Sequence, residues 1–250
     1  MSAYVNKHIW IIGASSGIGR SLAVELARQG AKLILSARNE DKLKALHQTL
    51  GPLHTILPLD VANPESLIKA TKSLHHIDSV IFMAGIYDPG PLSQFDLKSV
   101  RQIIDINLNG AFNTIHAALP ILKKQGFGQL VLCASVAGYV GLPNGQPYSA
   151  TKAALINLAE SLRAEERDLD IKVINPGFVR TKMTHKNNFK MPMIIAPEKA
   201  AIIIAKELQS SRFEIHFPKR FTYIMKMINM FPRSIYFALS KIIQKSNNGE

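Results

Sequence analysis

The sequence has little cysteine, few acidic residues and no long uninterrupted apolar run. Its one cysteine, Cys133, cannot form an intramolecular disulfide, and the N-terminus shows no basic segment followed by an apolar one, as a signal peptide would. These absences exclude a disulfide-stabilised secreted scaffold and predict a reducing, cytoplasmic compartment. The composition, 47% hydrophobic and 19% charged over 250 residues, excludes a disordered or fibrous chain and favours one globular domain.

The shortage of acidic residues is concentrated in the C-terminal quarter. The chain has 30 Lys and Arg against 18 Asp and Glu; residues 1–179 hold 17 against 14, and residues 180–250 hold 13 against 4. A basic segment of this kind suits an anionic partner. Aromatic residues are not interleaved with Arg or Lys in any nucleic-acid-binding module, so no nucleic-acid partner is predicted.

Short runs rich in Val and Ile alternate with segments of helical period along most of the chain. This alternation predicts an α/β fold: a doubly wound parallel sheet of about seven strands with helices on both faces. The expected strands are 7–12, 32–36, 54–57, 79–83, 129–134, 171–174 and 213–216. The expected helices are 17–29, 40–50, 64–74, 92–104, 106–124, 148–168 and 198–209.

A glycine-rich turn follows the first expected strand and opens the first expected helix. It reads Gly13-Ala14-Ser15-Ser16-Gly17-Ile18-Gly19. Glycines let the chain turn tightly and let a pyrophosphate approach the backbone, where the helix N-terminus offers free N–H groups. The turn therefore predicts a dinucleotide site.

The end of the second expected strand indicates which dinucleotide is bound. Enzymes that use NAD usually carry an acidic residue here for the ribose 2′-hydroxyl. This chain instead reads Ser36-Ala37-Arg38, with no carboxylate before Glu40. A guanidinium at Arg38 suits a 2′-phosphate, which favours NADP over NAD. The alternative is that Arg38 is a solvated residue at the start of a helix.

Tyr148 and Lys152 lie four residues apart at the start of one expected helix, so their side chains share a face. Ser135 lies at the end of the fifth strand, at the sheet edge where ligands of open α/β folds bind. A phenol has an ordinary pKa of about 10, and a nearby ammonium would lower it toward neutrality. A serine hydroxyl can donate a hydrogen bond to a carbonyl oxygen.

Together these residues resemble the classical, single-domain short-chain dehydrogenase/reductase family, over residues 7–217. The glycine turn looks like the family's cofactor turn, and Tyr148 to Lys152 matches its Tyr-x-x-x-Lys motif. Further matching positions are Asp60 and Val61 beside the adenine, Ala84 and Gly85 ending an Asn-Asn-Ala-Gly motif, Asn107 within a helix, Ser135 before Tyr148, and Pro176, Gly177, Val179 and Thr181 around the nicotinamide.

The resemblance implies a single Rossmann-fold domain that transfers a hydride between nicotinamide C4 and a carbonyl or secondary alcohol, and Arg38 makes NADP the expected cofactor. Tyr148 would be the general acid, and Lys152 would lower its pKa and hold the ribose hydroxyls. Ser135 would orient the carbonyl, and Asn107 would position a water that relays protons toward Lys152. The alternatives are a catalytically silent dinucleotide-binding sensor, although the catalytic set is intact, and a membrane-surface binding protein that acts through its C-terminal segment.

The chain departs from the family pattern at the first and fourth strands. Ile12 stands where Thr is usual, and Phe82 and Met83 stand where two Asn are usual. In the family, those polar residues tie the two strands together. Our hypothesis is that the three apolar residues replace the polar tie as a set, by packing.

The last third of the chain contains two further expected features. Residues 180–197 are interpreted as a mobile lid over an apolar, lipid-like substrate, lined by Met183, Phe189, Met191 and Met193 together with Val140, Leu142 and Phe178. Residues 1–217 form the catalytic domain. Residues 218–250 are a basic, apolar extension, expected as two short helices meeting at Pro232.

The extension has three possible uses: a subunit interface, a cover over the pocket, or a peripheral contact with anionic lipid. A transmembrane helix is excluded because Lys226, Pro232 and Arg233 interrupt it. The family resemblance also implies a homo-dimer or homo-tetramer, commonly formed through the helices at 106–124 and 148–168. No metal site is expected.

Overall fold

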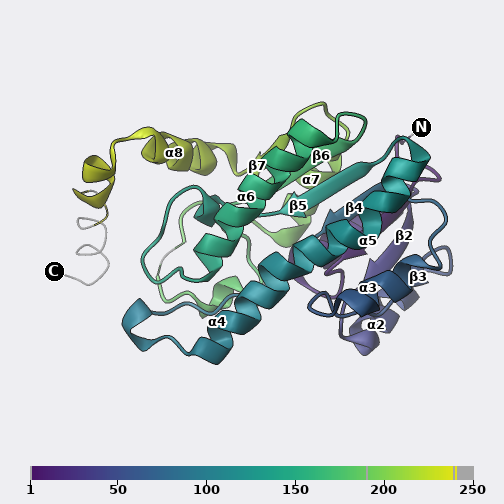
Figure 1. The fold of residues 1–250 in the computed structure, drawn as a ribbon, viewed down its shortest axis with the longest axis horizontal. Coiled ribbons are helices and arrows are strands. Elements are labelled where there is room, and N and C mark those ends of the chain that lie inside the picture. The colour runs from purple at the N-terminus through teal and green to yellow at the C-terminus, as the bar shows by residue number, and fades with distance from the viewer. Residues whose placement is uncertain (1, 190, 239, 241–250) are drawn as a thin grey trace.

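The computed structural model describes residues 2–189, 191–238 and 240. Seven parallel strands form one sheet in the order β3-β2-β1-β4-β5-β6-β7, with helices on both faces (Figure 1). The α/β fold expected from the sequence is therefore confirmed. The strands are β1 (His8–Ile12), β2 (Lys32–Ser36), β3 (Thr55–Ile56), β4 (Ser79–Phe82), β5 (Gln129–Cys133), β6 (Asp170–Pro176) and β7 (Glu214–Phe217).

The helices alternate with the strands as right-handed crossovers require. They are α1 (Gly17–Arg28), α2 (Glu40–Leu50), α3 (Pro64–Thr71), α4 (Leu97–Ile104), α5 (Gly110–Gln125), α6 (Tyr148–Glu165), α7 (Pro197–Leu208) and α8 (Lys219–Met230). The strand order reverses between β1 and β4. In folds of this kind a ligand binds at that reversal, beyond the carboxyl ends of the strands.

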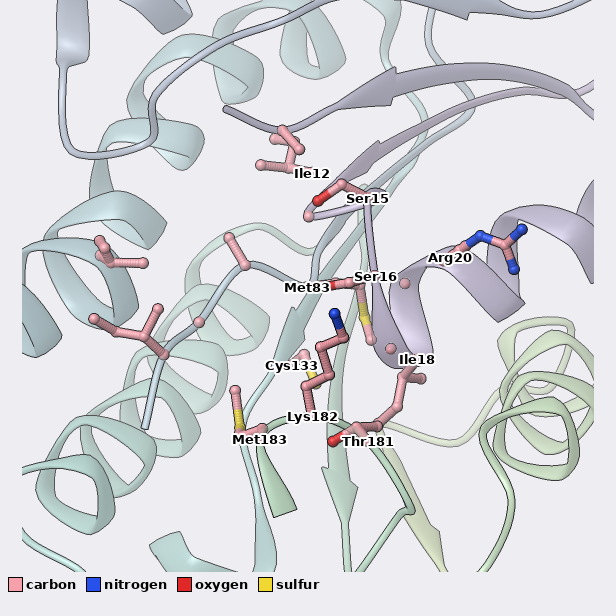
Figure 2. Close-up of a pocket in the computed structure, with 18 of the residues that line it drawn as sticks. Ile12, Ser15, Ser16, Ile18, Arg20, Met83, Cys133, Thr181, Lys182 and Met183 are labelled. Atoms are coloured by element: carbon pink, nitrogen blue, oxygen red, sulfur yellow. The ribbon is translucent and has the colours of Figure 1, made fainter. Parts of the chain in front are cut away.

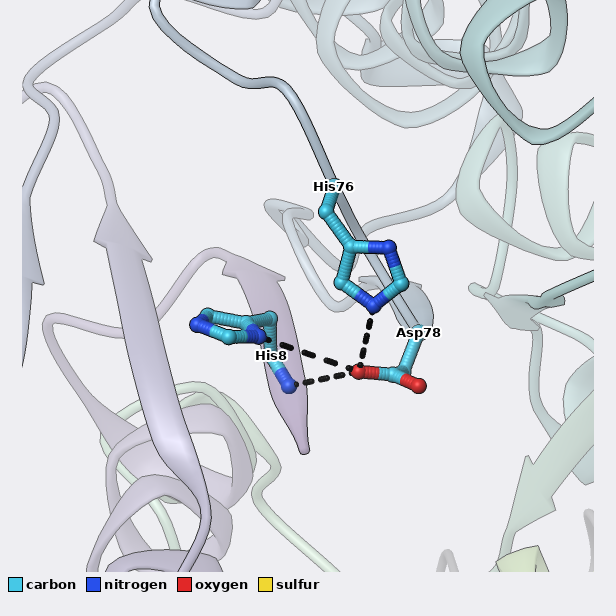
Figure 3. A group of neighbouring side chains, drawn as sticks. All are labelled: His8, His76 and Asp78. Carbon is cyan, nitrogen blue, oxygen red and sulfur yellow. Dashed lines mark hydrogen bonds and ion pairs between the residues drawn. The ribbon is translucent and has the colours of Figure 1, made fainter. Parts of the chain in front are cut away.

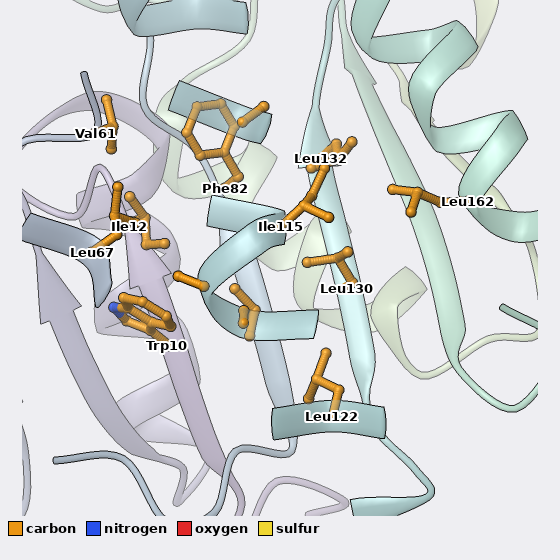
Figure 4. Close-up of a cluster of buried hydrophobic side chains, with 14 of the residues drawn as sticks. Trp10, Ile12, Val61, Leu67, Phe82, Ile115, Leu122, Leu130, Leu132 and Leu162 are labelled. Carbon is orange, nitrogen blue, oxygen red and sulfur yellow. The ribbon is translucent and has the colours of Figure 1, made fainter. Parts of the chain in front are cut away.

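Two cores lie on the two faces of the sheet, and β1 contributes to both. Trp10 and Ile12 are buried in the core formed with α3, α5 and α6 (Figure 4). Ile9 and Ile11 point the other way, into the core formed with α1, α2 and α7. Both sets are buried because a parallel sheet is covered on both faces, which explains why its strands read as continuous apolar runs.

The apolar residues that replace the family's polar tie are packed. Ile12 and Phe82 are register partners on β1 and β4, and both are fully buried in the same core. Met83 packs against the core on the other face. These contacts agree with the packing hypothesis, because each side chain meets apolar neighbours and none of the three requires a hydrogen bond.

The helix expected over 92–104 is wrong in its first part. A short 3₁₀ turn, Leu92–Gln94, comes first, and α4 begins only after Asp96. The Asp96 carboxylate accepts hydrogen bonds from the backbone N–H groups of Lys98 and Ser99, so it is the N-cap of a new helix. A π-helical turn, Asp105–Asn109, then joins α4 to α5.

The C-terminal extension packs one face on the domain. Thr222 and Met225 of α8 are buried, and α8 extends away from the sheet in Figure 1. The helix ends at Met230, before Pro232, and residues 233–238 are again helical. Residues 239 and 241–250 of the expected extension lie outside the described residues. In the part of the chain that the structure describes, no helix is long and apolar enough to span a bilayer.

Candidate active site

A cleft of about 910 Å³ opens at the carboxyl ends of the strands, beside the reversal between β1 and β4. Figure 2 shows side chains of the first turn, of the end of β5 and of the segment after β6 converging on it. Most of the predicted site residues line it: Gly13, Ser15, Ser16, Gly17, Ile18, Gly19, Arg38, Val61, Ala84, Gly85, Ser135, Tyr148, Lys152, Pro176, Gly177, Val179 and Thr181. Asp60 and Asn107 are not among the lining residues.

The glycine turn has a backbone that only glycine accommodates. Gly13 has φ +101°, and a Cβ there would lie 2.6 Å from the Ala84 nitrogen. A Cβ on Gly19 would lie 2.3 Å from the Gly13 oxygen. These close approaches bring the first turn of α1 against the end of β4 and direct its N-terminus into the cleft.

The N-terminus of α1 differs from those of α2 and α3, the next two helices along the chain. Asn39 and Asn63 cap α2 and α3 by accepting hydrogen bonds from backbone N–H groups. Ser16, at the N-cap of α1, makes no such side-chain bond. The first N–H groups of α1 are therefore available to a ligand in the cleft, and a helix N-terminus of this kind suits a phosphate. The turn thus fits the pyrophosphate of a dinucleotide.

The cleft is strongly cationic. None of the described residues that line it is acidic, whereas the lining includes Arg20, Arg38, Lys42, Lys152 and Lys182. Arg20, Lys42 and Lys182 were not predicted as site residues from the sequence. Arg20 directly follows the last glycine of the turn, and Lys42 lies four residues after Arg38. Their closeness in sequence to predicted site residues could therefore have identified both as part of the site. Glu40 does not line the cleft and pairs with Lys44 at 2.8 Å.

The predicted catalytic residues meet at the inner end of the cleft. Lys152 is buried one helical turn after Tyr148, and its Nζ donates to the Cys133 carbonyl at 2.7 Å. The same Nζ lies 5.5 Å from the centre of the Tyr148 ring. The Ser135 hydroxyl accepts from the Ala137 N–H at 3.1 Å and donates to the Pro176 carbonyl at 3.4 Å.

Burial dominates the protonation of this group. Removal from water raises the pKa of Tyr148 above its ordinary value, which outweighs a hydrogen bond to Ser135 that acts to lower it. Burial also lowers the pKa of Lys152. The expectation that Lys152 would bring the pKa of Tyr148 toward neutrality is therefore opposed here by a larger effect. The phenol keeps its proton at neutral pH and can act as an acid.

Asn107 lies behind the cleft wall. Its Oδ1 accepts from the Ile86 N–H at 2.8 Å, and its Nδ2 donates to the Ile86 carbonyl at 2.9 Å and to Thr151 Oγ1 at 3.3 Å. The side chain thus fixes the segment after β4 to α6. The expected water relay through Asn107 stays a prediction. The Asp60 carboxylate accepts from the Ala62 N–H, within its own turn.

The segment expected as a lid contributes Lys182, Met183 and Thr184 to the cleft lining. The Tyr87 hydroxyl donates to Asn187 at 2.9 Å, and Lys186 pairs with Asp88 at 3.1 Å, so residues after β4 hold the lid. The Tyr87 ring packs edge-on against Tyr148 at 4.9 Å between ring centres. Residue 190 of the expected lid lies outside the described residues.

The apolar lining expected for the substrate is only partly found in the cleft. Met183 lines it, as Figure 2 shows. The other expected residues do not: Val140, Leu142, Phe178, Phe189, Met191 and Met193. Val140 is instead buried against Met225 of α8, in a cluster that Leu142 joins. The loop after Ser135 therefore packs on the C-terminal extension, an arrangement that sequence patterns did not indicate.

A carboxylate behind the cleft joins three segments. Glu214 on β7 accepts hydrogen bonds from the Tyr139 hydroxyl and, at 2.7 Å, from Asn175 Nδ2, and it pairs with Lys226 of α8. Tyr139 belongs to the loop that carries Ser135, and Asn175 directly precedes Pro176. Glu214 thus ties the extension to both segments that flank Ser135. The sequence analysis did not single out this residue.

Comparisons with known proteins agree with this geometry. Residues 7–192 match the family model described as short chain dehydrogenase. An uncharacterized oxidoreductase of Myxococcus xanthus is 32% identical over 240 residues, which is 92% of this chain and 95% of that protein. An uncharacterized oxidoreductase of Staphylococcus epidermidis is 35% identical over 195 residues, 76% of this chain and 85% of that protein.

Solved structures show the same fold. A short chain dehydrogenase from Burkholderia cenocepacia in complex with NADP has a TM-score of 0.84 at 24% identity, covering 94% of this chain and 98% of that one. A short chain dehydrogenase/reductase from Burkholderia phymatum in complex with NAD has a TM-score of 0.81 at 22% identity, covering 90% and 94%. The matched model, the relatives and the shared fold lead to one conclusion: the chain belongs to the short-chain dehydrogenase/reductase family of oxidoreductases.

Proposed function

We propose that the protein is an NADP-dependent carbonyl reductase that acts on an apolar, lipid-like substrate, with Tyr148 as the general acid. The observation that carries the proposal is the composition of one cleft. It joins an open helix N-terminus, five cationic side chains without a lining carboxylate, and the set Ser135, Tyr148 and Lys152. A dinucleotide with three phosphates fits the first two features, and carbonyl reduction fits the third.

When bound, the nicotinamide supplies a hydride from C4 to the substrate carbonyl carbon. Tyr148 gives its proton to the carbonyl oxygen, so the product is a secondary alcohol. Its raised pKa supports this role because the phenol is protonated at neutral pH. Ser135 turns its one O–H away from the Pro176 carbonyl, which it reaches only at 3.4 Å, and donates it to the same oxygen. Lys152, with N–H groups left over beyond Cys133, holds the ribose hydroxyls.

The coenzyme preference rests on the residues after β2. Arg38 is exposed and lines the cleft, as do Arg20 and Lys42. An ionised 2′-phosphate gains charge-assisted hydrogen bonds from a guanidinium, and no lining carboxylate repels it. The alcohol dehydrogenase of Thermococcus sibiricus, a structural relative 27% identical to this chain, is complexed with 5-hydroxy-NADP.

Coenzyme binding tests the proposal. Purified protein is titrated with NADPH and with NADH, followed by coenzyme fluorescence, for the wild type, Arg38→Ala and the control Arg167→Ala, an exposed arginine outside the cleft. We expect NADPH affinity to fall about tenfold to a hundredfold in Arg38→Ala alone, the loss of one charged hydrogen bond. Equal affinities unaffected by Arg38→Ala would overturn the NADP preference. Binding of neither coenzyme would overturn the reductase proposal.

We also propose that the enzyme works at the cytoplasmic surface of an anionic membrane, through α8 and the residues that follow. Its exposed apolar residues are Tyr223, Ile224, Met227, Met230, Phe231, Ile235 and Phe237. Four cations, Lys219, Arg220, Lys226 and Arg233, lie among them, and no acidic residue occurs from 215 to 238. Apolar and basic residues together favour the interface of anionic lipid.

Truncation is a poor test of this contact because Thr222 and Met225 are buried in the domain. The pair Met227→Ser and Met230→Ser alters only exposed residues, and Leu53→Ser, 74% exposed on another surface, is the control. We expect only the pair to reduce co-sedimentation with vesicles containing phosphatidylserine. A changed oligomeric state with unchanged sedimentation would overturn the membrane contact and identify a subunit interface.

Homo-oligomer formation through α5 and α6 is the third proposal. Phe112 on α5 is 50% exposed, which is unusual for a large aromatic residue on a helix that otherwise packs on the sheet. Size-exclusion chromatography with light scattering tests it: Phe112→Arg is expected to dissociate the oligomer. A wild-type monomer would contradict the proposal.

A further inference from the structure

Three side chains with metal-ligand chemistry meet at the end of the sheet opposite the cleft. His8 begins β1, Asp78 directly precedes β4, and His76 lies two residues earlier (Figure 3). The backbone fixes the first two, because the His8 N–H donates to Asp78 Oδ2 at 2.8 Å and the Asp78 N–H donates to the His8 carbonyl at 2.8 Å. Two of the three groups are therefore held by neighbouring strands.

The ligand atoms converge. His76 Nε2 lies 3.2 Å and His8 Nδ1 lies 3.9 Å from Asp78 Oδ2, and the three atoms all lie within 4.8 Å of one another. A tetrahedral zinc ion with bonds of about 2.0–2.2 Å separates its ligand atoms by roughly 3.3–3.6 Å. Small rotations of the two imidazole rings would close the difference. Figure 3 shows both rings presenting a nitrogen to the carboxylate.

The donor set and its exposure favour one class of ion. Two imidazole nitrogens and one carboxylate oxygen suit zinc and its first-row neighbours, whereas magnesium and calcium prefer all-oxygen sites. The side chains of His8 and His76 are 39% and 44% exposed, so an ion can enter from solvent and water can complete its coordination. Asp78 is only 12% exposed, which limits its movement.

A lysine competes with an ion at this position. Lys7 Nζ pairs with Asp78 Oδ1 at 2.8 Å, on the carboxylate oxygen that the two histidines do not share. Oδ2 accepts the His8 N–H but keeps a second lone pair for an ion, although the nearby ammonium repels a cation. This competition provides a test. If Asp78 is a metal ligand, removing the charge of Lys7 should strengthen metal binding. If Asp78 serves only to pair with Lys7, removing that charge should not strengthen it.

We propose that His8, His76 and Asp78 bind a divalent transition-metal ion of the zinc class, at a site remote from the cofactor cleft. The bound ion would join the start of β1 to the segment before β4. Its effect falls on the stability of the fold, because the ligands lie at the amino ends of the strands and the catalytic residues at the carboxyl ends. Nothing in this inference depends on the proposed reductase activity.

The test measures zinc binding to tag-free, chelator-treated full-length protein by titration calorimetry, with cobalt absorption as a second readout of tetrahedral coordination. His76→Ala removes a ligand. His75→Ala is the matched control, since His75 is an exposed neighbouring histidine outside the cluster. We expect His76→Ala to weaken the tightest zinc site at least tenfold and to abolish the cobalt bands, with His75→Ala unchanged.

Lys7→Met supplies the opposite change. We expect it to tighten zinc binding several-fold, and zinc to raise the thermal midpoint of the wild type and Lys7→Met but not of His76→Ala. Coenzyme binding is expected to stay constant in all variants. Equal zinc affinity in the wild type and His76→Ala would overturn the proposal, as would weaker binding in Lys7→Met.

Discussion

The polar groups of the cleft and those of the cluster around Glu214 are used differently. In the cleft, Lys152 donates to one carbonyl, and the lining cations face no lining carboxylate. Behind the cleft, the Glu214 carboxylate receives Tyr139, Asn175 and Lys226. The first cluster leaves its charges open to a ligand, whereas the second uses its charges to hold the protein in place. Polar groups without a protein partner therefore indicate the binding site, and polar groups paired within the protein indicate the structure that supports it.

Removal of the phenol hydroxyl is the largest expected effect on the cleft cluster. Tyr148→Phe should lower kcat by about 10²–10⁴, the usual contribution of a positioned general acid. NADPH affinity should change little, because the hydroxyl serves the substrate. Steady-state kinetics and coenzyme titration measure the two quantities. Tyr223→Phe, at a 58% exposed position on α8, is the control, and equal losses in both variants would contradict the assignment.

A substitution in the glycine turn should also have a large effect, in this case on the stability of the fold. Gly13→Ala requires a Cβ at φ +101° and 2.6 Å from the Ala84 nitrogen. We expect it to lower the free energy of unfolding by more than about 1 kcal/mol, because alanine cannot adopt that conformation without strain. Denaturant unfolding measures the loss. Gly90→Ala, with no atom within 4 Å of its Cβ, should leave stability unchanged.

Substitution of Glu214 should have a smaller effect on stability, and that effect should depend on pH. Burial acts to raise the pKa of Glu214, but its bonds to Lys226, Tyr139 and Asn175 outweigh burial and hold the pKa below the ordinary value. A lowered pKa means that the ionised carboxylate stabilises the fold above the unfolded pKa of about 4.3, and that this stability is lost as the pH falls through the folded pKa.

Glu214→Gln should therefore destabilise the protein most near neutral pH, with the difference from the wild type shrinking below about pH 4. Chemical unfolding at several pH values measures this. Glu160→Gln, at an exposed position on α6, should show no such trend. A pH-independent difference for Glu214→Gln would contradict an ionic role and indicate lost packing instead.

Most of the fold could be predicted because a parallel sheet leaves a strong local signal. Each strand is buried on both faces, so β1, β2 and β5 appear as apolar runs, and Asn63 with Pro64 marks the start of α3. The predicted bounds of helices and strands failed where a local signal competed with the general pattern. Asp96 begins a new helix inside an apparently continuous one, and β3, at one edge of the sheet, is only two residues long where residues 54–57 were expected.

The residues of the cleft could be predicted more easily than Glu214 and its partners, again because their signal is local in the sequence. Ser135, Tyr148 and Lys152 fall in a recognisable spacing, and the glycine turn is contiguous in sequence. Glu214 has no such signal, since its three partners lie 75, 39 and 12 residues away. Nor could the apolar pattern show that Val140 packs on Met225 and not in the cleft, because both environments are apolar.

Because Lys226 and Met225 lie late in the chain, their contacts can form only late in synthesis. A ribosome delivers the glycine turn, Ser135, Tyr148 and Lys152 long before α8 emerges. Until then Glu214 lacks its ammonium, and the loop after Ser135 lacks the apolar cover that Met225 provides. Glu214 and Lys226 are only 12 residues apart, so their pair can form as soon as α8 is made. The contact between Met225 and the loop after Ser135 spans a long stretch of chain, and such contacts form late because the intervening chain must first be ordered. A nascent chain arrested before α8 should therefore hold its coenzyme turn while its catalytic loop is still unfinished.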